Sequence, residues 1–280
     1  MTSDAALGDS AMIRRPVVAG RFYPGSAQAL RREVAGYLAL ADPELAGPAV
    51  LAMSPHAGYV FSGAVAGRTL GAATLPDTLL LLGPNHTGRG ARLAVWPEGA
   101  WEIPGTAVPV DAGLAGELLA AEPRLVADRA AHLAEHSLEV LLPFLREKNP
   151  ALRIVPVAVA EPDPAVLDGV GRAVAAAIRQ HGEPVGIVVS SDMSHYVTHD
   201  TAKRRDALAL SRVLDLDPMG LLSVVRREGI TMCGVLPMGL GLVAALELGA
   251  SQAVLAAYAT SGEVSGDMEQ VVGYAGVLVR

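Results

Sequence analysis

The sequence predicts a single α/β domain with a mostly parallel central sheet and helices on both of its faces. Short apolar runs alternate with longer segments of helical periodicity, and this repeated β-α-β order is typical of parallel strands joined by crossover helices. The run from Leu79 to Leu82 is too uniformly apolar for an exposed strand. No internal repeat or linker divides the 280 residues. We therefore expect a flexible N-terminal tail over residues 1–13 and one domain over residues 14–280.

The first half of the chain supplies three strands and two helices in this interpretation. Val50–Met53 is a short buried strand, and the small residues of Ser62–Ala73 indicate a helix. Thr78–Leu82 is a second buried strand, and Ala91–Trp96 extends the sheet. Asp111–Ala121 reads as a helix whose first residue is the N-cap, because an Asp side chain accepts hydrogen bonds from the free N–H groups there.

The second half continues the alternation. Glu135–Glu147 predicts a helix broken or kinked at Pro143, because proline removes a backbone donor. Further strands are expected at Arg153–Val159, Val185–Val189, Ala253–Thr260 and Val271–Val279, the last two closing the sheet. Further helices are expected at Pro164–Gln180, Asp200–Leu214, Pro218–Arg227 and Pro237–Leu248. Gly249 stands where the last helix should stop.

Composition argues against several classes of function. A net charge of −7 with scattered basic pairs argues against nucleic acid as a partner, which needs a concentrated basic face. The uncharged, apolar stretch Ile230–Leu246 is interrupted by a proline and glycines and is short for a membrane span, and the N-terminus lacks an apolar signal core. Cys233 is the only cysteine, so no internal disulfide can form. We expect a cytoplasmic protein that binds neither nucleic acid nor membrane.

Polar residues follow three of the predicted strands at the point where each strand ends. His56 follows the first strand, His86 the second, and Asp192 and His195 follow the strand at Val185–Val189. The carboxyl ends of parallel strands form the ligand crevice of open α/β sheets, so these side chains are expected to converge. Taken singly, each histidine could be a hydrogen-bonded loop residue, and Asp192 could be a helix cap. Their recurrence at strand ends favours a metal or acid-base site.

Other candidates are weaker on sequence alone. Cys233, just ahead of an apolar helix, is either a small buried hydrophobe or a thiolate ligand. His132 and His136 are four residues apart, but the helix is expected to start at about Glu135. This predicts a loop position for His132, a helix-start role for Glu135 and a pocket-lining role for His136. The remaining two histidines, without a partner pattern, are expected on the surface: His181 and His199.

Two sequence patterns resemble known functional motifs but occur in the wrong structural context. The stretch Gly239–Ala244 matches a dinucleotide-binding fingerprint, but it lies inside a predicted helix and therefore indicates small-residue helix packing. Ser190 and Ser191 follow a strand without the glycines of a nucleophile elbow, so serine-hydrolase chemistry is not expected.

Several short motifs, taken in order, carry a family resemblance. They are Arg15–Pro24 (RPVVAGRFYP), Pro55–Tyr59, Gly83–His86, Glu135–Ser137, Pro143–Phe144, Ser190–Asp192, His195 and Cys233–Gly234. With them the chain, from about Arg14 to Arg280, resembles the MEMO family, whose bacterial members are also called AmmeMemoRadiSam system protein B. That family is similar in fold to the class III extradiol (LigB-type) dioxygenases, so the resemblance implies a LigB-like fold.

The resemblance also implies a metal pocket. His56, His86 and Cys233 match the ligand positions of the family, and Asp192 and His195 match its other pocket residues. In the dioxygenases two histidines and a glutamate hold Fe(II). Here Cys233 stands in place of that carboxylate, which weakens the expectation of ring cleavage. A thiolate makes the site softer, so Cu(I), Fe(II) and Zn all fit. The resemblance to the iron dioxygenases makes Fe(II) the expected cofactor.

Three classes of function follow from these observations. The first is a metal-dependent redox or dioxygenase-like enzyme acting on a small molecule, with His195 and Asp192 as its acid-base pair. The second is a non-catalytic metal-binding or peptide-binding partner in a modification system, alongside the family's radical SAM and AMMECR1-type companions. The third is a hydrolase that uses a zinc-activated water.

Overall fold

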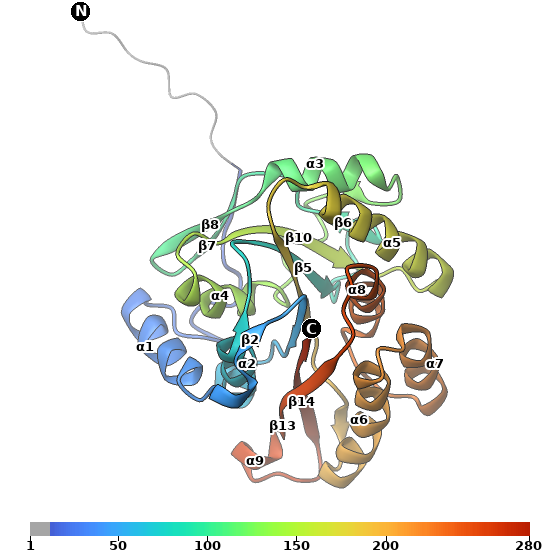
Figure 1. The fold of residues 1–280 in the computed structure, drawn as a ribbon. Helices are drawn as coiled ribbons and strands as arrows, with labels where there is room; N and C mark the ends of the chain where they lie inside the picture. The colour runs from blue at the N-terminus through green and yellow to red at the C-terminus, as the bar shows by residue number, and fades with distance from the viewer. Residues whose placement is uncertain (1–11) are drawn as a thin grey trace, which may run out of the picture.

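A nine-stranded sheet forms the centre of residues 12–280, the part of the chain that the computed structural model describes (Figure 1). Its strands are β3 (Leu51–Ser54), β5 (Thr78–Pro84), β6 (Leu93–Val95), β9 (Val126–Ala127), β10 (Arg153–Val159), β11 (Val185–Ser190), β12 (His195–Val197), β13 (Ala253–Thr260) and β14 (Val271–Val279). Their order is β12-β14-β3-β11-β5-β10-β6-β9, with β13 paired to β14.

The four central strands are parallel, as the sequence predicts. Strand β11 lies between β3 and β5 and pairs in parallel with both, and β5 pairs in parallel with β10. The strand on each side of these four is antiparallel to its neighbour, since β14 runs against β3 and β6 runs against β10. The two C-terminal strands close the sheet as an antiparallel pair. The carboxyl ends of β3, β5 and β11 therefore lie along one edge of the sheet.

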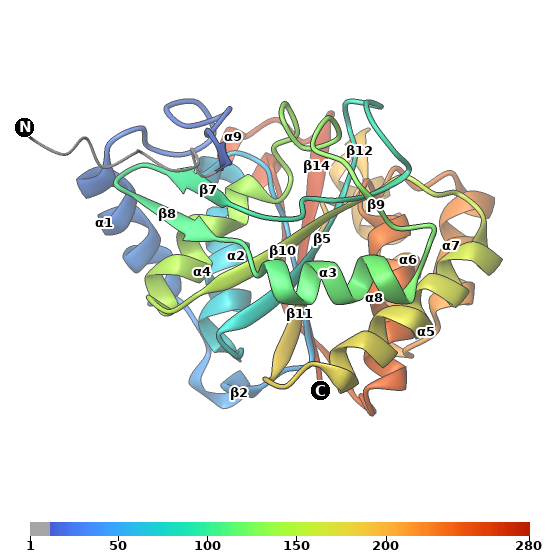
Figure 2. The ribbon, with the colours of Figure 1, turned by 90° about the horizontal axis from the view of Figure 1, so that it is seen from above.

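Helices cover both faces of this sheet (Figures 1 and 2). One face carries α1 (Ala27–Leu38), α2 (Tyr59–Ala72) and α4 (Leu142–Lys148), and the other carries α3 (Ala112–Ala121), α5 (Pro164–Gln180), α6 (His199–Leu214), α7 (Pro218–Glu228) and α8 (Val235–Glu247). A short helix, α9 (Gly262–Ser265), lies between β13 and β14. Leu51 and Met53 belong to the core on the α8 side, whereas Ala52 between them belongs to the core on the α2 side. Burial of both faces explains the continuous apolar runs.

Two small sheets were not predicted. One joins β1 (Ile13–Arg14), β7 (Ala100–Ile103) and β8 (Thr106–Pro109), and the other joins β2 (Gly47–Pro48) and β4 (Ala73–Thr74). Strands of two to four residues are too short for their periodicity to be read from sequence. Ile13 pairs with Ala100, so the predicted tail extends too far at its C-terminal end. Residues 1–11 of that tail lie outside the described residues.

The helix predicted over Glu135–Glu147 is wrong in its first half. The segment from His132 to Leu138 consists of turns and loop, Glu139–Leu141 is a 3-10 turn, and α4 begins only at Leu142. Pro143 lies in the first turn of α4, where a missing N–H costs nothing, so it opens the helix instead of kinking it. The start of α2 is three residues earlier than predicted and that of α8 two residues earlier.

Several local predictions are confirmed. Oδ1 of Asp111 accepts a hydrogen bond from the backbone N–H of Leu114, as expected of an N-cap. Gly249 follows α8 with a φ of 94°, a conformation that favours glycine. The glycine pattern lies within α8, where a Cβ on Gly241 would meet Val189 at 2.9 Å and Leu51 at 3.0 Å. These glycines allow the helix to pack closely on the sheet.

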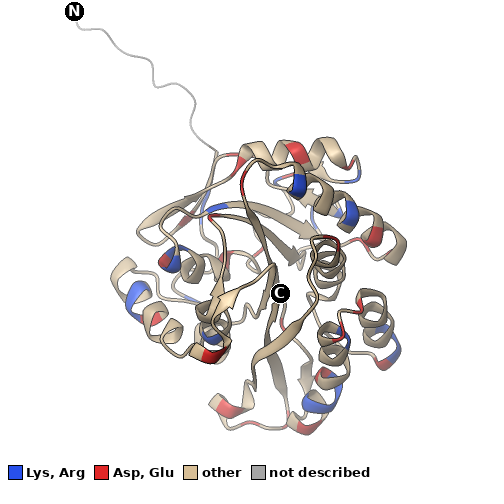
Figure 3. Cartoon of the chain, viewed as in Figure 1, with Lys and Arg blue, Asp and Glu red and all other residues tan. Residues whose placement is uncertain are grey.

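Charged residues are distributed over the outer helices of the molecule. Lys and Arg are interspersed with Asp and Glu there (Figure 3). Across residues 12–280, no helix is both long enough and apolar enough to cross a membrane.

Candidate metal centre

The loops that follow β3 and β5 meet the turn before α8 at the carboxyl edge of the sheet. Strands β3 and β11 end level with each other, because Ser54 pairs with Ser190. His56 lies two residues past the end of β3, and His86 two residues past the end of β5. One potential ligand atom from each of His56, His86 and Cys233 lies within 4.8 Å of the others. The structure thus brings together the three residues proposed as ligands, although 177 positions separate His56 from Cys233.

Cys233 reaches this cluster from the turn that precedes α8. Its Sγ lies 3.5 Å from Nε2 of His56 and accepts a hydrogen bond from the backbone N–H of Asp192 at 3.2 Å. Gly234 permits this approach, because a Cβ at that position would meet the carbonyl oxygen of Ser190 at 2.4 Å. A glycine is therefore required sterically at the position that follows Cys233.

A chain of hydrogen bonds orients the imidazole of His56. Its Nδ1 lies 2.7 Å from Oγ of Ser190, and the hydroxyl of Ser190 donates to the carbonyl of Ser137 at 2.7 Å. A serine hydroxyl has one proton, so Nδ1 of His56 must be the donor to Ser190. Nε2 of the neutral ring is then unprotonated and faces Cys233. Because Ser190 is fully buried and engaged in this way, it is not placed as a nucleophile, in line with the sequence prediction.

A carboxylate orients His86. Nδ1 of His86 lies 2.9 Å from Oε1 of Glu135, and the same carboxylate accepts the backbone N–H groups of His86, His136 and Ser137. An acceptor with four donors is in its ionised form, so Nδ1 of His86 carries a proton. Burial opposes a charged ring, but the hydrogen bond to Glu135 and the charge of that carboxylate raise the pKa of His86, which favours a proton on Nε2 that a metal ion must displace. The prediction that Glu135 starts a helix is therefore wrong. Its carboxylate binds His86 and the backbone of its own loop. The only sequence signal for this orienting role was the position of an acidic residue immediately before His136.

A buried ion pair anchors the loop that carries Glu135. Arg14 and Glu139, both fully buried, are 2.8 Å apart. Arg14 also donates to the carbonyls of His132 and Glu135, and its guanidinium lies 4.1 Å from the ring centroid of Trp101. Nothing in the sequence distinguishes Arg14, because a single arginine in a two-residue strand forms no pattern.

His136 lies beside both imidazoles. Its ring stacks on that of His86 with centroids 5.0 Å apart and meets the ring of His56 edge-on at 5.5 Å. It therefore lies within the cluster, and its pocket-lining role stays a prediction. Potential ligand atoms of His86, Glu135 and His136 form a second close group. However, Nδ1 of His86 and both oxygens of Glu135 are already hydrogen-bonded, so we interpret this group as orienting rather than metal-binding.

Burial and charge set the protonation of these groups. Burial, with the neighbouring His86 and His136, lowers the pKa of His56 well below its usual value. Burial also lowers the pKa of His136. Burial would raise the pKa of Glu135, but its hydrogen bonds to His86 and to backbone N–H groups lower it to about 2. Burial, helped by the charge of Asp192, raises the pKa of the Cys233 thiol, so a metal ion must displace the thiol proton in order to bind.

Asp192 and His195 share the loop after β11 but contact different partners. Oδ1 of Asp192 accepts the backbone N–H of His56 at 2.8 Å, and its Oδ2 lies 3.9 Å from Nε2 of the same ring. Nδ1 of His195 donates to the carbonyl of Thr231 at 2.9 Å, which leaves Nε2 as the proton acceptor. No hydrogen bond within residues 12–280 joins the side chains of Asp192 and His195, and their catalytic roles stay predictions.

The other histidines lie outside the cluster. His132 is buried in a loop and hydrogen-bonded to the carbonyl of Ala94. The surface position predicted for His181 and His199 is only partly right, because both are half-buried. His181 contacts Glu117, and the imidazole of His199 contacts the hydroxyl of Thr260.

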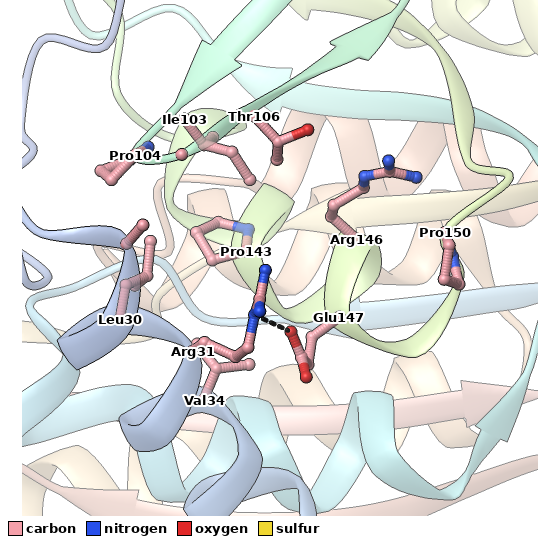
Figure 4. Close-up of a pocket in the computed structure, with 12 residues that line it drawn as sticks. Leu30, Arg31, Val34, Ile103, Pro104, Thr106, Pro143, Arg146, Glu147 and Pro150 are labelled. Atoms are coloured by element: carbon pink, nitrogen blue, oxygen red, sulfur yellow. Dashed lines mark ion pairs between the residues drawn. The ribbon is translucent and has the colours of Figure 1, made fainter.

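A separate hollow of about 300 Å³ lies between α1, α4 and the turn that joins β7 to β8 (Figure 4). Its walls include Leu30, Val34 and Pro143, and Arg31 pairs with Glu147 at 3.5 Å beside it. No residue of the histidine and cysteine cluster lines this hollow. This hollow is therefore separate from the histidine and cysteine cluster.

Fold and site together define an α/β protein with a cluster of histidine and cysteine side chains at the carboxyl edge of a mainly parallel sheet. The profile of the family described as Memo-like protein matches residues 14–278. The chain belongs to this family.

Similar proteins cover nearly the whole chain. A MEMO1 family protein of Methanopyrus kandleri is 40% identical, with 96% of this chain and 99% of that protein aligned. A MEMO1 family protein of Methanothermobacter thermautotrophicus is 39% identical over 94% of this chain and 99% of its own length. A crystal structure of an uncharacterised Escherichia coli K12 protein has a TM-score of 0.55 at 15% identity, over 81% of this chain and 98% of that one. This last match supports the fold alone.

Proposed function

We propose that His56, His86 and Cys233 bind one transition-metal ion, Fe(II) in preference to Cu or Zn, and that the site carries out a redox or dioxygenase-like reaction on a small molecule. The observation that carries the proposal is the convergence of the three donor atoms within 4.8 Å. Two imidazole nitrogens and one sulfur form a set that borderline and soft transition metals favour over Mg²⁺ or Ca²⁺ once the metal has displaced their protons. The residues therefore fit the metal that the family resemblance implies.

Three protein ligands leave coordination positions for other molecules. A metal bound there supplies Lewis acidity and electron transfer to whatever occupies those positions. His195 accepts or returns a proton at Nε2, because its Nδ1–H is held by Thr231. Asp192 holds the backbone of His56 in place and keeps a carboxylate oxygen near Nε2 of that ring.

Metal analysis after anaerobic purification tests the proposal. We expect stoichiometric metal in the natural protein and its loss in His56→Ala and Cys233→Ala. His181→Ala is the matched control, since the imidazole of this histidine pairs with Glu117 at 2.9 Å and belongs to neither group of potential ligand atoms. If the natural protein contains no iron, copper or zinc and takes up none when supplied, the proposal is wrong.

The identity of the metal separates the classes of function. Iron or copper with oxygen consumption supports the redox function. Zinc without any redox response would contradict the redox function and would support hydrolysis instead. A metal-loaded protein that turns over no substrate but captures radical SAM or AMMECR1-type proteins would contradict it in favour of a binding partner.

A further inference from the structure

We propose that a single loop, Glu135–Ser137, positions both imidazole ligands, acting directly on His86 and through Ser190 on His56. Ser190 and Glu135 are then positioning residues that hold each ring with Nδ1 protonated and Nε2 directed at the metal. This inference rests on the proposed metal site for its function, but the ring orientation itself can be measured without metal.

The effect on His56 is transmitted in two steps. The carbonyl of Ser137 takes the only hydroxyl proton of Ser190, at 2.7 Å. Oγ of Ser190 is thereby left as an acceptor, 2.7 Å from Nδ1 of His56. All three residues are buried, so solvent does not offer a competing partner. The backbone of the loop thus determines which nitrogen of His56 is protonated.

The effect on His86 is direct. Glu135 accepts Nδ1 of His86 at 2.9 Å, and its other oxygen accepts the backbone N–H of the same residue at 2.5 Å. Because Glu135 accepts hydrogen bonds from both the ring and the backbone of His86, the rotation of the imidazole is fixed. Carboxylate partners of ligand histidines act in this way in metalloproteins generally.

The loop is itself held against the sheet and the N-terminal strand. Oγ of Ser137 donates to the carbonyl of Pro84 at the end of β5. Gly83 permits this contact, because a Cβ there would meet Oγ of Ser137 at 2.9 Å. On the other side Arg14 donates to the carbonyl of Glu135. These contacts make the loop a rigid base for the two rings.

Ser190→Ala and Glu135→Gln test the two branches separately. Each should weaken binding of Co(II), used as the spectroscopic probe, by about 10- to 100-fold, the usual effect of losing such a partner. Each should also change the cobalt absorption bands. Ser54→Ala is the matched control: Ser54 pairs with Ser190 across the sheet, is equally buried, and its hydroxyl has no partner within residues 12–280. We expect Ser54→Ala to bind Co(II) like the natural protein.

The second measurement uses metal-free protein labelled with ¹⁵N. The ring-nitrogen signals of His56 and His86 should report protonated Nδ1 in the natural protein and in Ser54→Ala. In Ser190→Ala the His56 signals should shift toward protonated Nε2 while those of His86 do not, and Glu135→Gln should shift those of His86. Unchanged signals in folded variants would overturn the inference, whether or not the natural protein binds metal. Failure of the natural protein to bind any metal, with the signals shifted as expected, would contradict only the proposed function.

Discussion

Burial between Trp96 and Trp101 lowers the pKa of His132 to about 4. Its Nε2 donates to the carbonyl of Ala94, and its Nδ1 has no partner in the described part of the chain. The unfolded chain, with a pKa near 6.5, takes up this proton first as the pH falls. Stability that is fully present above pH 6.5 is therefore lost progressively toward pH 4.

We expect this residue alone to lower the free energy of unfolding by about 3 kcal/mol between pH 7 and pH 4, because each pKa unit corresponds to about 1.4 kcal/mol. His132→Gln cannot be protonated and retains a donor for Ala94, so its stability should depend less on pH. Urea denaturation of both proteins at the two pH values measures the difference. Equal losses of stability in the two proteins would contradict the expectation.

The ion pair between Arg14 and Glu139 concentrates unusually many buried contacts on one carboxylate. Glu139 also accepts the backbone N–H groups of Val17 and Val18 and the hydroxyl of Tyr23. Removing one member of a buried pair leaves the other charge without compensation, which is far more costly than replacing both.

Glu139→Gln should therefore lower the free energy of unfolding by about 3 to 5 kcal/mol. Glu147→Gln is the control, because its pair with Arg31 is largely exposed and such pairs contribute at most about 1 kcal/mol. Guanidinium denaturation of the two variants and the natural protein gives both values. A loss as small for Glu139→Gln as for the control would show that the buried pair does not anchor the loop.

Among the helices and strands, the long periodic segments could be predicted from sequence. The loop before α4, which is held by contacts with distant residues, could not. Strand β10 and helix α5 were predicted with their observed bounds, because both have continuous apolar patterns. The stretch from His132 to Leu138 has a helix-like pattern of leucines and acidic residues. Its conformation depends instead on Glu135 binding His86 and on Arg14 binding the loop carbonyls. Those partners are distant in sequence, so no local pattern indicates them.

Gly234, between Cys233 and α8, leaves no room for a side chain. Gly234→Ala would bring a Cβ to 2.4 Å from the carbonyl of Ser190 and should displace the sulfur from His56. We expect lower metal content and a loss of about 1 to 3 kcal/mol of stability, as for other overpacked sites. Gly36→Ala, in α1 with nothing within 4 Å of its Cβ, should instead stabilise the fold by up to about 1 kcal/mol. Thermal melts and metal analysis of both variants measure these effects, and normal metal content in Gly234→Ala would contradict the steric argument.

For the whole molecule, the sequence predicts the parallel sheet and the convergence of His56 and His86, because the edge at which parallel strands end follows from their order. Strand order could not place Cys233, which lies on no strand and reaches the edge from the turn before α8; only the family resemblance indicated it as a ligand. Nor could it predict that Asp192 and His195 contact His56 and Thr231 rather than each other. Such contacts depend on loop conformations that only the assembled fold determines.

The position of Cys233 also bears on how the protein is made. During synthesis on the ribosome the chain emerges from its N-terminus, and His56 and His86 leave the exit tunnel long before the sulfur does. A nascent chain can present at most two of the three donors until Cys233, which precedes α8, has been translated. The complete donor set of the proposed metal site is therefore assembled only after synthesis has passed the turn before α8.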